Sequence, residues 1–426
     1  MIDIRYTKQE TQEALIARHL GESPDVSQTV SAILANVRQQ GDAAIREYTQ
    51  QFDQVTLTDF RVSEADIQQA VANVDSDFLD ILKQAKQNIQ QFHELQQQRG
   101  YVTTGDGIVM GQRVISLETV GVYVPGGTAA YPSTVLMDVL PAKIAGVKKV
   151  VMITPPNKEG QIPAVILAAA QIAGVDEIYK VGGAQGVAGL AYGTESLPKV
   201  DKIVGPGNIF VATAKKMVYG TVDIDMIAGP SDVLIVADDS ATPAWIAADL
   251  LAQAEHDTLA QAVLVTPSEA IAQAVQAELT RQLAELPRQA IAKQSLETNG
   301  KLIVTEDLEE ALELANHIAP EHLELCVAEP FALLGKVKNA GSVFLGHHTP
   351  EVLGDYFAGP NHTLPTEGTS RFYSSLSVDD FIKKSSYLYY SNEALQKVTN
   401  QVVTFAQMEG LDGHARSMAI RKEQTE

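Results

Sequence analysis

The sequence is poor in cysteine and in long apolar runs. Cys326 is the single cysteine among 426 residues, so a disulfide framework within one chain is excluded and a cytoplasmic location is favoured. No stretch approaches the ~18 consecutive apolar residues of a membrane span. The first residues, MIDIRYTKQE, lack a basic region followed by an apolar stretch, and we predict no secretory signal peptide.

Basic residues are also scarce. The chain has 32 lysines and arginines against 53 aspartates and glutamates, which gives a net charge of −21. Such a chain repels phosphate backbones and anionic membrane surfaces, so we expect neither a nucleic acid nor a membrane as partner. Hydrophobic residues make up 45% of the chain, a value typical of a globular enzyme, and the length predicts two or three domains.

The residues before Leu117 are predicted to be mostly helical. Ser27–Phe52 and Asp75–Gln98 carry apolar residues at helical spacing. Ser63 and Asp66, three residues apart, predict a capping box at the start of another helix.

From Leu117 onward, short apolar runs alternate with glycine turns and helical stretches, a pattern that predicts βαβ units and parallel sheets. The first series of predicted strands is Val120–Val124, Lys149–Thr154, Glu177–Val181 and Lys202–Val204. The second series is Val233–Ala237, Ala262–Thr266, Lys301–Val304, Leu323–Val327 and Ser342–Leu345. From Val378 the pattern predicts a helical tail to the end of the chain. The fold class is therefore α/β, with two Rossmann-like domains.

Glycine turns after the strands are candidate anion sites, because a helix that follows such a turn presents free backbone N–H groups. The dinucleotide fingerprint G-x-G-x-x-G is absent, and the turn beginning at Gly182 has the wrong spacing. Taken alone, these glycines favour tight turns over a cofactor cradle.

Gln253 and His256 lie three residues apart near the end of a predicted helix, and hence on one face. With Asp355, His362 and His414 they offer nitrogen and oxygen ligands without a thiolate, a set that suits zinc, manganese or cobalt. Spacing alone cannot assemble residues so far apart. A metal site and ordinary polar residues therefore both remain open as interpretations.

Glu321 and His322 are adjacent and stand just before a predicted strand. Together they offer two proton-transfer groups of different pKa, although a surface turn would contain the same residue types. Their position at the end of a strand favours function, because sites in α/β sheets lie at strand ends. Cys326 stands in an apolar run and is interpreted as a buried packing residue.

Eight motifs resemble those of the histidinol dehydrogenase family, from about residue 25 over nearly the whole chain. They are VGVYVPGG at 120–127, GGAQGVAGL at 182–190, DKIVGPGN at 201–208, DIDMIAGPSDVLIVAD at 223–238, ADLLAQAEHD at 248–257, APEHLEL at 319–325, GDYFAGPNHTLPT at 354–366 and EGLDGH at 409–414.

The resemblance implies a zinc enzyme that oxidises L-histidinol to L-histidine through L-histidinal, in the final steps of histidine biosynthesis, with two NAD molecules. The implied ligands of one zinc ion per subunit are Gln253, His256, Asp355 and His414. The implied substrate contacts are Ser231, Gln253, His256, His322, Asp355, Glu409 and His414. The NAD-binding positions are matched by Tyr123, Gln185 and Asn208, which reverses the interpretation of the glycine turns as structural only.

In the implied reaction His322 is the base for the hydroxyl proton, and Glu321 activates water for attack on the aldehyde. The resemblance also implies an aldehyde-dehydrogenase-like architecture and a homodimer in which residues 378–426 reach the partner's site. The expected domains are a segment 1–24, a discontinuous domain of residues 25–118 and 233–377, and an NAD-binding domain of residues 119–232.

Two local features depart from the family: Glu367 stands where a glycine is more frequent, and Ser385–Tyr390 is rich in tyrosine. A metal-dependent hydrolase and a binding protein without activity are the competing hypotheses. A cysteine-dependent aldehyde dehydrogenase is disfavoured, since Cys326 is the single thiol.

Overall fold

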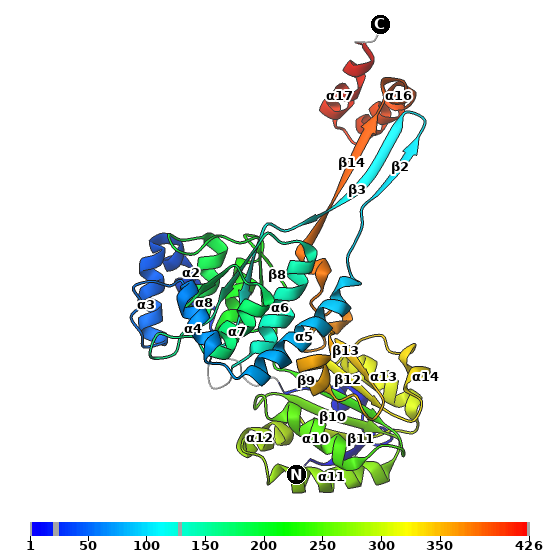
Figure 1. Cartoon of the computed structure of the whole chain (residues 1–426). Helices are drawn as coiled ribbons and strands as arrows, with labels where there is room; N and C mark the ends of the chain where they lie inside the picture. The colour runs from blue at the N-terminus through cyan, green and yellow to red at the C-terminus, as the bar shows by residue number, and fades with distance from the viewer. Residues whose placement is uncertain (1, 20–24, 127–129, 424–426) are drawn as a thin grey trace. The chain divides into compact units, whose positions relative to one another are not determined.

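The computed structural model describes residues 2–19, 25–126 and 130–423. It divides into two compact units (Figure 1). The larger unit comprises Met1–Gln96 and Leu117–Phe381, and the smaller comprises Gln97–Ser116 and Ile382–Glu426. The end of the predicted segment 1–24 and part of the predicted glycine turn after Val124 lie outside the described residues.

A six-stranded sheet forms one half of the larger unit, and every neighbouring pair in it is parallel. Its order is β1 (Ile4–Tyr6), β11 (Lys301–Val304), β10 (Gln261–Thr266), β9 (Asp232–Ala237), β12 (His322–Cys326) and β13 (Ser342–Leu345). All residues of β9, β10 and β12 are buried, because helices cover both faces. One face packs on α10 (Pro243–Ala254), α11 (Glu269–Leu283) and α12 (Gln289–Asn299), and the other packs on α13 (Leu308–Ile318).

A five-stranded parallel sheet forms the other half of the larger unit. Its order is β6 (Glu177–Tyr179), β5 (Lys149–Ile153), β4 (Thr119–Tyr123), β7 (Lys202–Val204) and β8 (Asp223–Ile224). One core holds α2 (Ser27–Gln40), α3 (Asp42–Phe52), α8 (Gly183–Tyr192) and α9 (Ile209–Val218). The other holds α4 (Glu64–Ala72), α5 (Ser76–Glu94), α6 (Pro132–Ala145) and α7 (Ala164–Ala173). The two predicted parallel sheets are thus confirmed.

Helices α2 to α5 differ from the predicted domain division. The buried apolar residues of α2, α3 and α5 and the partly buried ones of α4 pack in the cores of the five-stranded sheet, whereas residues 25–118 were expected to belong with residues 233–377. An amphipathic helix shows in its sequence that one face is covered, but not which sheet covers it. The predicted helix Ser27–Phe52 is also two helices, because Gly41 adopts a φ of 55° between them. The capping box of Ser63 and Asp66 is confirmed.

The smaller unit corrects two predictions of helical structure. Its antiparallel sheet has the order β14 (Ile382–Tyr390), β3 (Ile108–Ser116) and β2 (Tyr101–Gly105). Strands β2 and β3 lie in the region expected to be mostly helical, and β14 lies in the tail expected to be helical from Val378. The tail begins with the short 3-10 turn η3 (Val378–Phe381), and its α-helices, α16 (Asn392–Met408) and α17 (Asp412–Glu423), follow β14. The tyrosine-rich segment Ser385–Tyr390 is part of β14, in agreement with the strand preference of aromatic residues.

Two short elements of the larger unit matter for the site. The helix α15 (Glu351–Leu353) runs directly into the π-helical turn η1 (Gly354–Ala358). Among the described residues no helix is both long and apolar enough to cross a bilayer.

Candidate functional site

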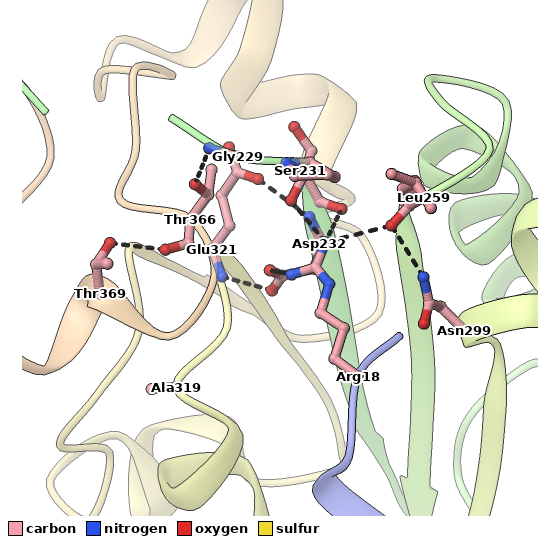
Figure 2. Close-up of polar contacts among 12 residues, drawn as sticks. Arg18, Gly229, Ser231, Asp232, Leu259, Asn299, Ala319, Glu321, Thr366 and Thr369 are labelled. Atoms are coloured by element: carbon pink, nitrogen blue, oxygen red, sulfur yellow. Dashed lines mark hydrogen bonds and ion pairs between the residues drawn. The ribbon is translucent and has the colours of Figure 1, made fainter. Parts of the chain in front are cut away.

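Glu321 and Asp232 lie at the amino ends of two neighbouring strands, β12 and β9. The Glu321 backbone N–H donates to Asp232 Oδ1 over 2.8 Å, and the Asp232 N–H donates to Glu321 Oε2 over 3.1 Å (Figure 2). Each side chain is therefore fixed by the other's backbone. The pair lies at the amino edge of the sheet, opposite to the carboxyl edge at which open α/β sheets usually bind ligands.

His322 opens β12 and is buried. Its Nδ1 lies 3.1 Å from the carbonyl oxygen of Asp232, which only accepts, so Nδ1 carries a proton. Its Nε2 lies 3.5 Å from Asp355 Oδ1, and within the described residues it has no hydrogen-bond partner. The ring is thus oriented by a backbone carbonyl, and its second nitrogen points at a carboxylate.

Carboxylates surround this imidazole. Burial lowers the pKa of His322, but Glu351, Glu321 and Asp355 together raise that pKa well above its usual value. Burial raises the pKa of Glu321 to about 7, although His322 acts in the opposite direction. A carboxyl group with such a pKa exchanges protons near neutrality, as a general base requires.

Asp355 lies in the π-helical turn η1, a type of turn that is frequent at functional sites. Burial raises the pKa of Asp355, and His322 outweighs this effect, so that the pKa is lowered overall. Atoms of His322, Glu351 and Asp355 lie within 4.8 Å of one another, close enough to hold a metal ion together. Glu351 was missed in the sequence, although its position four residues before Asp355 is a usable helical signal.

Gln253 is fully buried near the end of α10, and neither atom of its amide group has a hydrogen-bond partner in the part of the chain that is described. An unsatisfied buried polar group costs about 1–3 kcal/mol, and such a group calls for a specific explanation. Burial lowers the pKa of the nearby His256, while Asp355 and His322 act on it electrostatically. A neutral imidazole and an amide oxygen without a partner are suitable metal ligands.

His362, the other histidine considered as a ligand, is occupied by hydrogen bonds. Its Nδ1 lies 2.9 Å from the Asp355 carbonyl oxygen, and its Nε2 lies 3.2 Å from Thr134 Oγ1 of α6. Two neighbouring contacts also join this loop to α6: Asn361 donates to the Met137 carbonyl, and Thr363 donates to Asp138. The His362 ring therefore supports the turn that carries Asp355.

Glu409 and His414 belong to the smaller unit, where Glu409 is the C-cap residue directly after α16 and His414 lies in α17. Both are exposed. The larger unit thus brings Asp355 together with His322 and places His256 within range of their electrostatic effect. Glu409 and His414 belong to the other unit.

The residues predicted to bind NAD follow three strands of the five-stranded sheet. Tyr123 ends β4, and its hydroxyl oxygen accepts a hydrogen bond from the Gly183 N–H over 3.1 Å. The Asn208 side chain caps α9 by accepting from two backbone N–H groups. Gln185 is buried in α8, and the described residues offer no partner to its Oε1. Tyr123 lies at the carboxyl end of its strand and the other two lie beyond such ends, at the usual ligand edge. Tyr123 and Asn208 also stabilise the turns.

A buried ion pair holds the turn before Asn208. Lys215 pairs with Asp225 and donates to the Gly205 carbonyl over 2.8 Å, while Asp225 accepts from the Gly205 N–H over 2.7 Å. Both side chains are almost fully buried. Both the N–H and the carbonyl group of Gly205 in this turn are therefore held by buried side chains.

Ser231 directly precedes β9, and Cys326 ends β12. The Ser231 carbonyl accepts from the Gln261 N–H over 3.1 Å. It also accepts from Arg18 over 3.2 Å (Figure 2). Cys326 is buried, and burial raises the pKa of its thiol, which confirms it as a packing residue.

Glu367, which departs from the family pattern, adopts a φ of 54°. This left-handed conformation costs a residue with a side chain about 1–2 kcal/mol relative to glycine. We therefore expect Glu367→Gly to raise the free energy of unfolding by about 1 kcal/mol, as measured by urea denaturation. The same substitution at Glu329, whose φ is −124°, relieves no strain and should not stabilise the protein. Equal effects at the two positions would contradict this explanation.

The comparisons with known proteins agree with one another. The family model described as Histidinol dehydrogenase matches residues 16–422. A histidinol dehydrogenase of Listeria innocua is 57% identical over 403 residues, which cover 94% of this chain and 94% of that protein. One of Listeria monocytogenes is 56% identical and covers 97% and 96%. A crystal structure of histidinol dehydrogenase from Elizabethkingia anophelis is 37% identical, with a TM-score of 0.94 and coverage of 100% of this chain and 98% of that chain.

Proposed function

Because the chain belongs to the histidinol dehydrogenase family, as its motifs predicted, we propose that it oxidises L-histidinol to L-histidine through L-histidinal. Two NAD molecules accept the hydrides, a zinc ion is the resident metal, and the reactions are the last steps of histidine biosynthesis. The observation that carries the proposal is the convergence of Glu321, His322 and Asp355 in a chain that matches the family from residue 16 to 422.

Gln253, His256 and Asp355 are the proposed zinc ligands within the larger unit, with His414 as the fourth. The unpartnered buried amide of Gln253 and the low pKa of His256 fit this role. The ion would supply a Lewis acid that holds the imidazole of histidinol, with the substrate's nitrogens completing its ligand set. Ser231 and Glu409 are the proposed further contacts to the substrate.

His322 is the proposed base in the first oxidation. The hydroxyl proton of histidinol passes to Nε2, the nitrogen that faces Asp355, while the carbon gives its hydride to NAD. The contact of Nδ1 with the Asp232 carbonyl orients the ring for this transfer. For this role the imidazole has to be neutral. The negative charge of Asp355 and the other carboxylates, which raises the pKa of His322, therefore has to be partly compensated when the substrate is bound.

Glu321 is the proposed base in the second oxidation. It takes a proton from water as the oxygen attacks the aldehyde carbon of histidinal, and the hydrated aldehyde then gives its hydride to the second NAD. The pKa of about 7 suits this transfer near neutral pH. The resulting carboxylic acid is histidine, so one water and two NAD balance the four-electron oxidation.

NAD is proposed to bind at the carboxyl edge of the five-stranded sheet, at Tyr123, Gln185 and Asn208. These residues surround turns whose backbone N–H groups begin α8 and α9. We place the activity in the cytoplasm, where a single buried thiol such as that of Cys326 is ordinary.

The test is the appearance of NADH when histidinol is added to the protein. Treatment with a chelator is expected to abolish turnover, and added zinc to restore it, because histidinol is oriented by the ion. A metal-dependent hydrolase would produce no NADH. Full activity in metal-free protein would contradict the zinc assignment.

His256→Ala separates the metal from the rest of the site. We expect this variant to lose bound zinc and activity while it remains folded, as shown by metal analysis and thermal unfolding. His317→Ala is the matched control, since His317 is an exposed histidine at the end of α13. A His256→Ala protein that keeps its zinc would remove His256 from the ligand set.

A further inference from the structure

Arg18 reaches the start of β9 from the amino-terminal segment of the chain. Its Nη1 donates to Asp232 Oδ2 over 2.7 Å, and its Nη2 donates to the carbonyl oxygens of Pro230 over 2.6 Å and Ser231 over 3.2 Å (Figure 2). The side chain of Arg18 is 11% exposed and that of Asp232 is 3% exposed. One guanidinium group therefore holds three consecutive residues in a nearly dry environment.

The backbone on either side of Arg18 is itself anchored. The His19 N–H donates to Asn299 Oδ1 over 2.9 Å, and the Asn299 amide donates back to the His19 carbonyl over 3.0 Å. Lys301 donates to the carbonyl oxygens of Leu15 and Ala17, and the Leu15 side chain is buried in the core. The position of the guanidinium group is thus determined by several contacts outside the site.

Asp232 connects this arginine to Glu321. Its Oδ2 binds Arg18, its Oδ1 accepts from the Glu321 N–H, and its own N–H donates to the Glu321 carboxylate. Its carbonyl also accepts from His322. The side chain of Asp232, which pairs with Arg18, thus holds the backbone of Glu321, whereas His322 contacts only a backbone carbonyl of β9.

The charge of Arg18 matters as much as its hydrogen bonds. Without the guanidinium group, the carboxylate of Asp232 would be buried next to Glu321 with no cation paired to it, and like charges at such sites repel strongly. The side chain of Asp232 would then turn away from Glu321. This movement removes the acceptor of the Glu321 N–H and so disturbs the backbone from which the Glu321 carboxylate extends.

We propose that Arg18 is a positioning residue for the water-activating step, and that it acts through Asp232 on Glu321. The inference rests on the proposed function, because it concerns the base of the second oxidation. Arg18 touches neither Glu321 nor His322 by any contact recorded among the described residues, so it is not itself catalytic.

Two reactions that both start from histidinal separate positioning from a general loss of structure. Oxidation of histidinal by NAD requires activated water. Reduction of histidinal by NADH is the reverse of the first hydride transfer and requires no water attack. For Arg18→Met we expect oxidation to fall by about tenfold or more and reduction to fall by less than about threefold, since small misplacements at a reacting centre can cost up to about 100-fold.

Three further variants complete the experiment. Arg18→Lys keeps the charge but not the planar fork, so it should recover part of the oxidation rate. Arg5→Met is the matched control. Arg5, like Arg18, lies in the amino-terminal segment and pairs with a carboxylate, but its partner is Glu10, away from β9. In the double variant with Glu321→Gln, Arg18→Met should add little further loss of oxidation, because both changes act on one step.

Equal loss of oxidation and reduction in Arg18→Met, no loss in either, or losses that multiply in the double variant would overturn the proposal. If Arg18→Met does not fold, Arg18→Lys decides by the same ratio of the two rates. If the unaltered protein neither oxidises nor reduces histidinal, the proposed function fails and the role of Arg18 fails with it. An active protein with an unchanged ratio in the Arg18 variants refutes the role of Arg18 alone.

Discussion

Replacing Glu321 with glutamine is expected to lower the oxidation of histidinal by about 100- to 10,000-fold, the usual contribution of a general base. Glutamine has the same shape, and its amide oxygen can still accept from the Asp232 N–H, as Glu321 Oε2 does over 3.1 Å. It cannot take a proton from water. The reduction of histidinal by NADH should fall far less, because that reaction needs no activated water.

The measurement is the rate of NADH formation or consumption with histidinal as substrate in each direction. His322→Asn is the matched contrast: it removes the base that serves the hydride transfers, and it should lower both directions. Glu329→Gln is the control for the loss of a carboxylate, since Glu329 is exposed and precedes α14 (Pro330–Leu334) outside the site. A Glu321→Gln protein that loses both directions equally would show that Glu321 does not act on water.

Most strands of the two parallel sheets could be predicted, because the central ones are buried on both faces. The edge strands β1 and β8 are at most partly buried and were not predicted. Strands such as β9 and β10 appear in the sequence as unbroken apolar runs that end in turn residues. The strands of the smaller unit have no such signal. All five residues of β2 are exposed, and β14 is exposed along most of its length, so neither shows the alternation of a half-buried strand.

Some residues of the site could likewise be predicted from the sequence, and others could not. Glu321 and His322 are adjacent, and Gln253 and His256 share a helix face, so each pair could be found by spacing. Asp232 and Arg18 were missed because their contacts join residues far apart in the chain. The contact of Asp232 with Glu321 spans 89 residues and that with Arg18 spans 214. No local pattern in the sequence carries information about such contacts.

The second large effect that we expect is a restoration of activity that depends on the smaller unit. It carries Glu409 and His414 on helices with little core of their own, and Phe405 and Met408 of α16 are 70% and 85% exposed. Exposed apolar side chains grouped on one helix are typical of a surface that another molecule covers. We propose that this molecule is a second copy of the chain, and that each smaller unit completes the site of its partner with Glu409 and His414.

Mixing two inactive proteins tests this proposal. His414→Ala protein and Glu321→Gln protein are each expected to be inactive, and subunit exchange between them should restore about a quarter of the sites in a symmetric dimer. The reason is that half of the dimers are then mixed. One of the two sites in each mixed dimer combines an intact Glu321 with an intact His414 from the other chain.

The matched control is a mixture of Glu321→Gln protein with His322→Asn protein. Both of these lesions lie in the larger unit, so every site in that mixture is defective whichever chain supplies His414. Activity in the first mixture but not in the control would show that the smaller unit acts on its partner. If both mixtures stay as inactive as their parents although exchange is complete, His414 serves the chain that carries it, and the shared site is refuted.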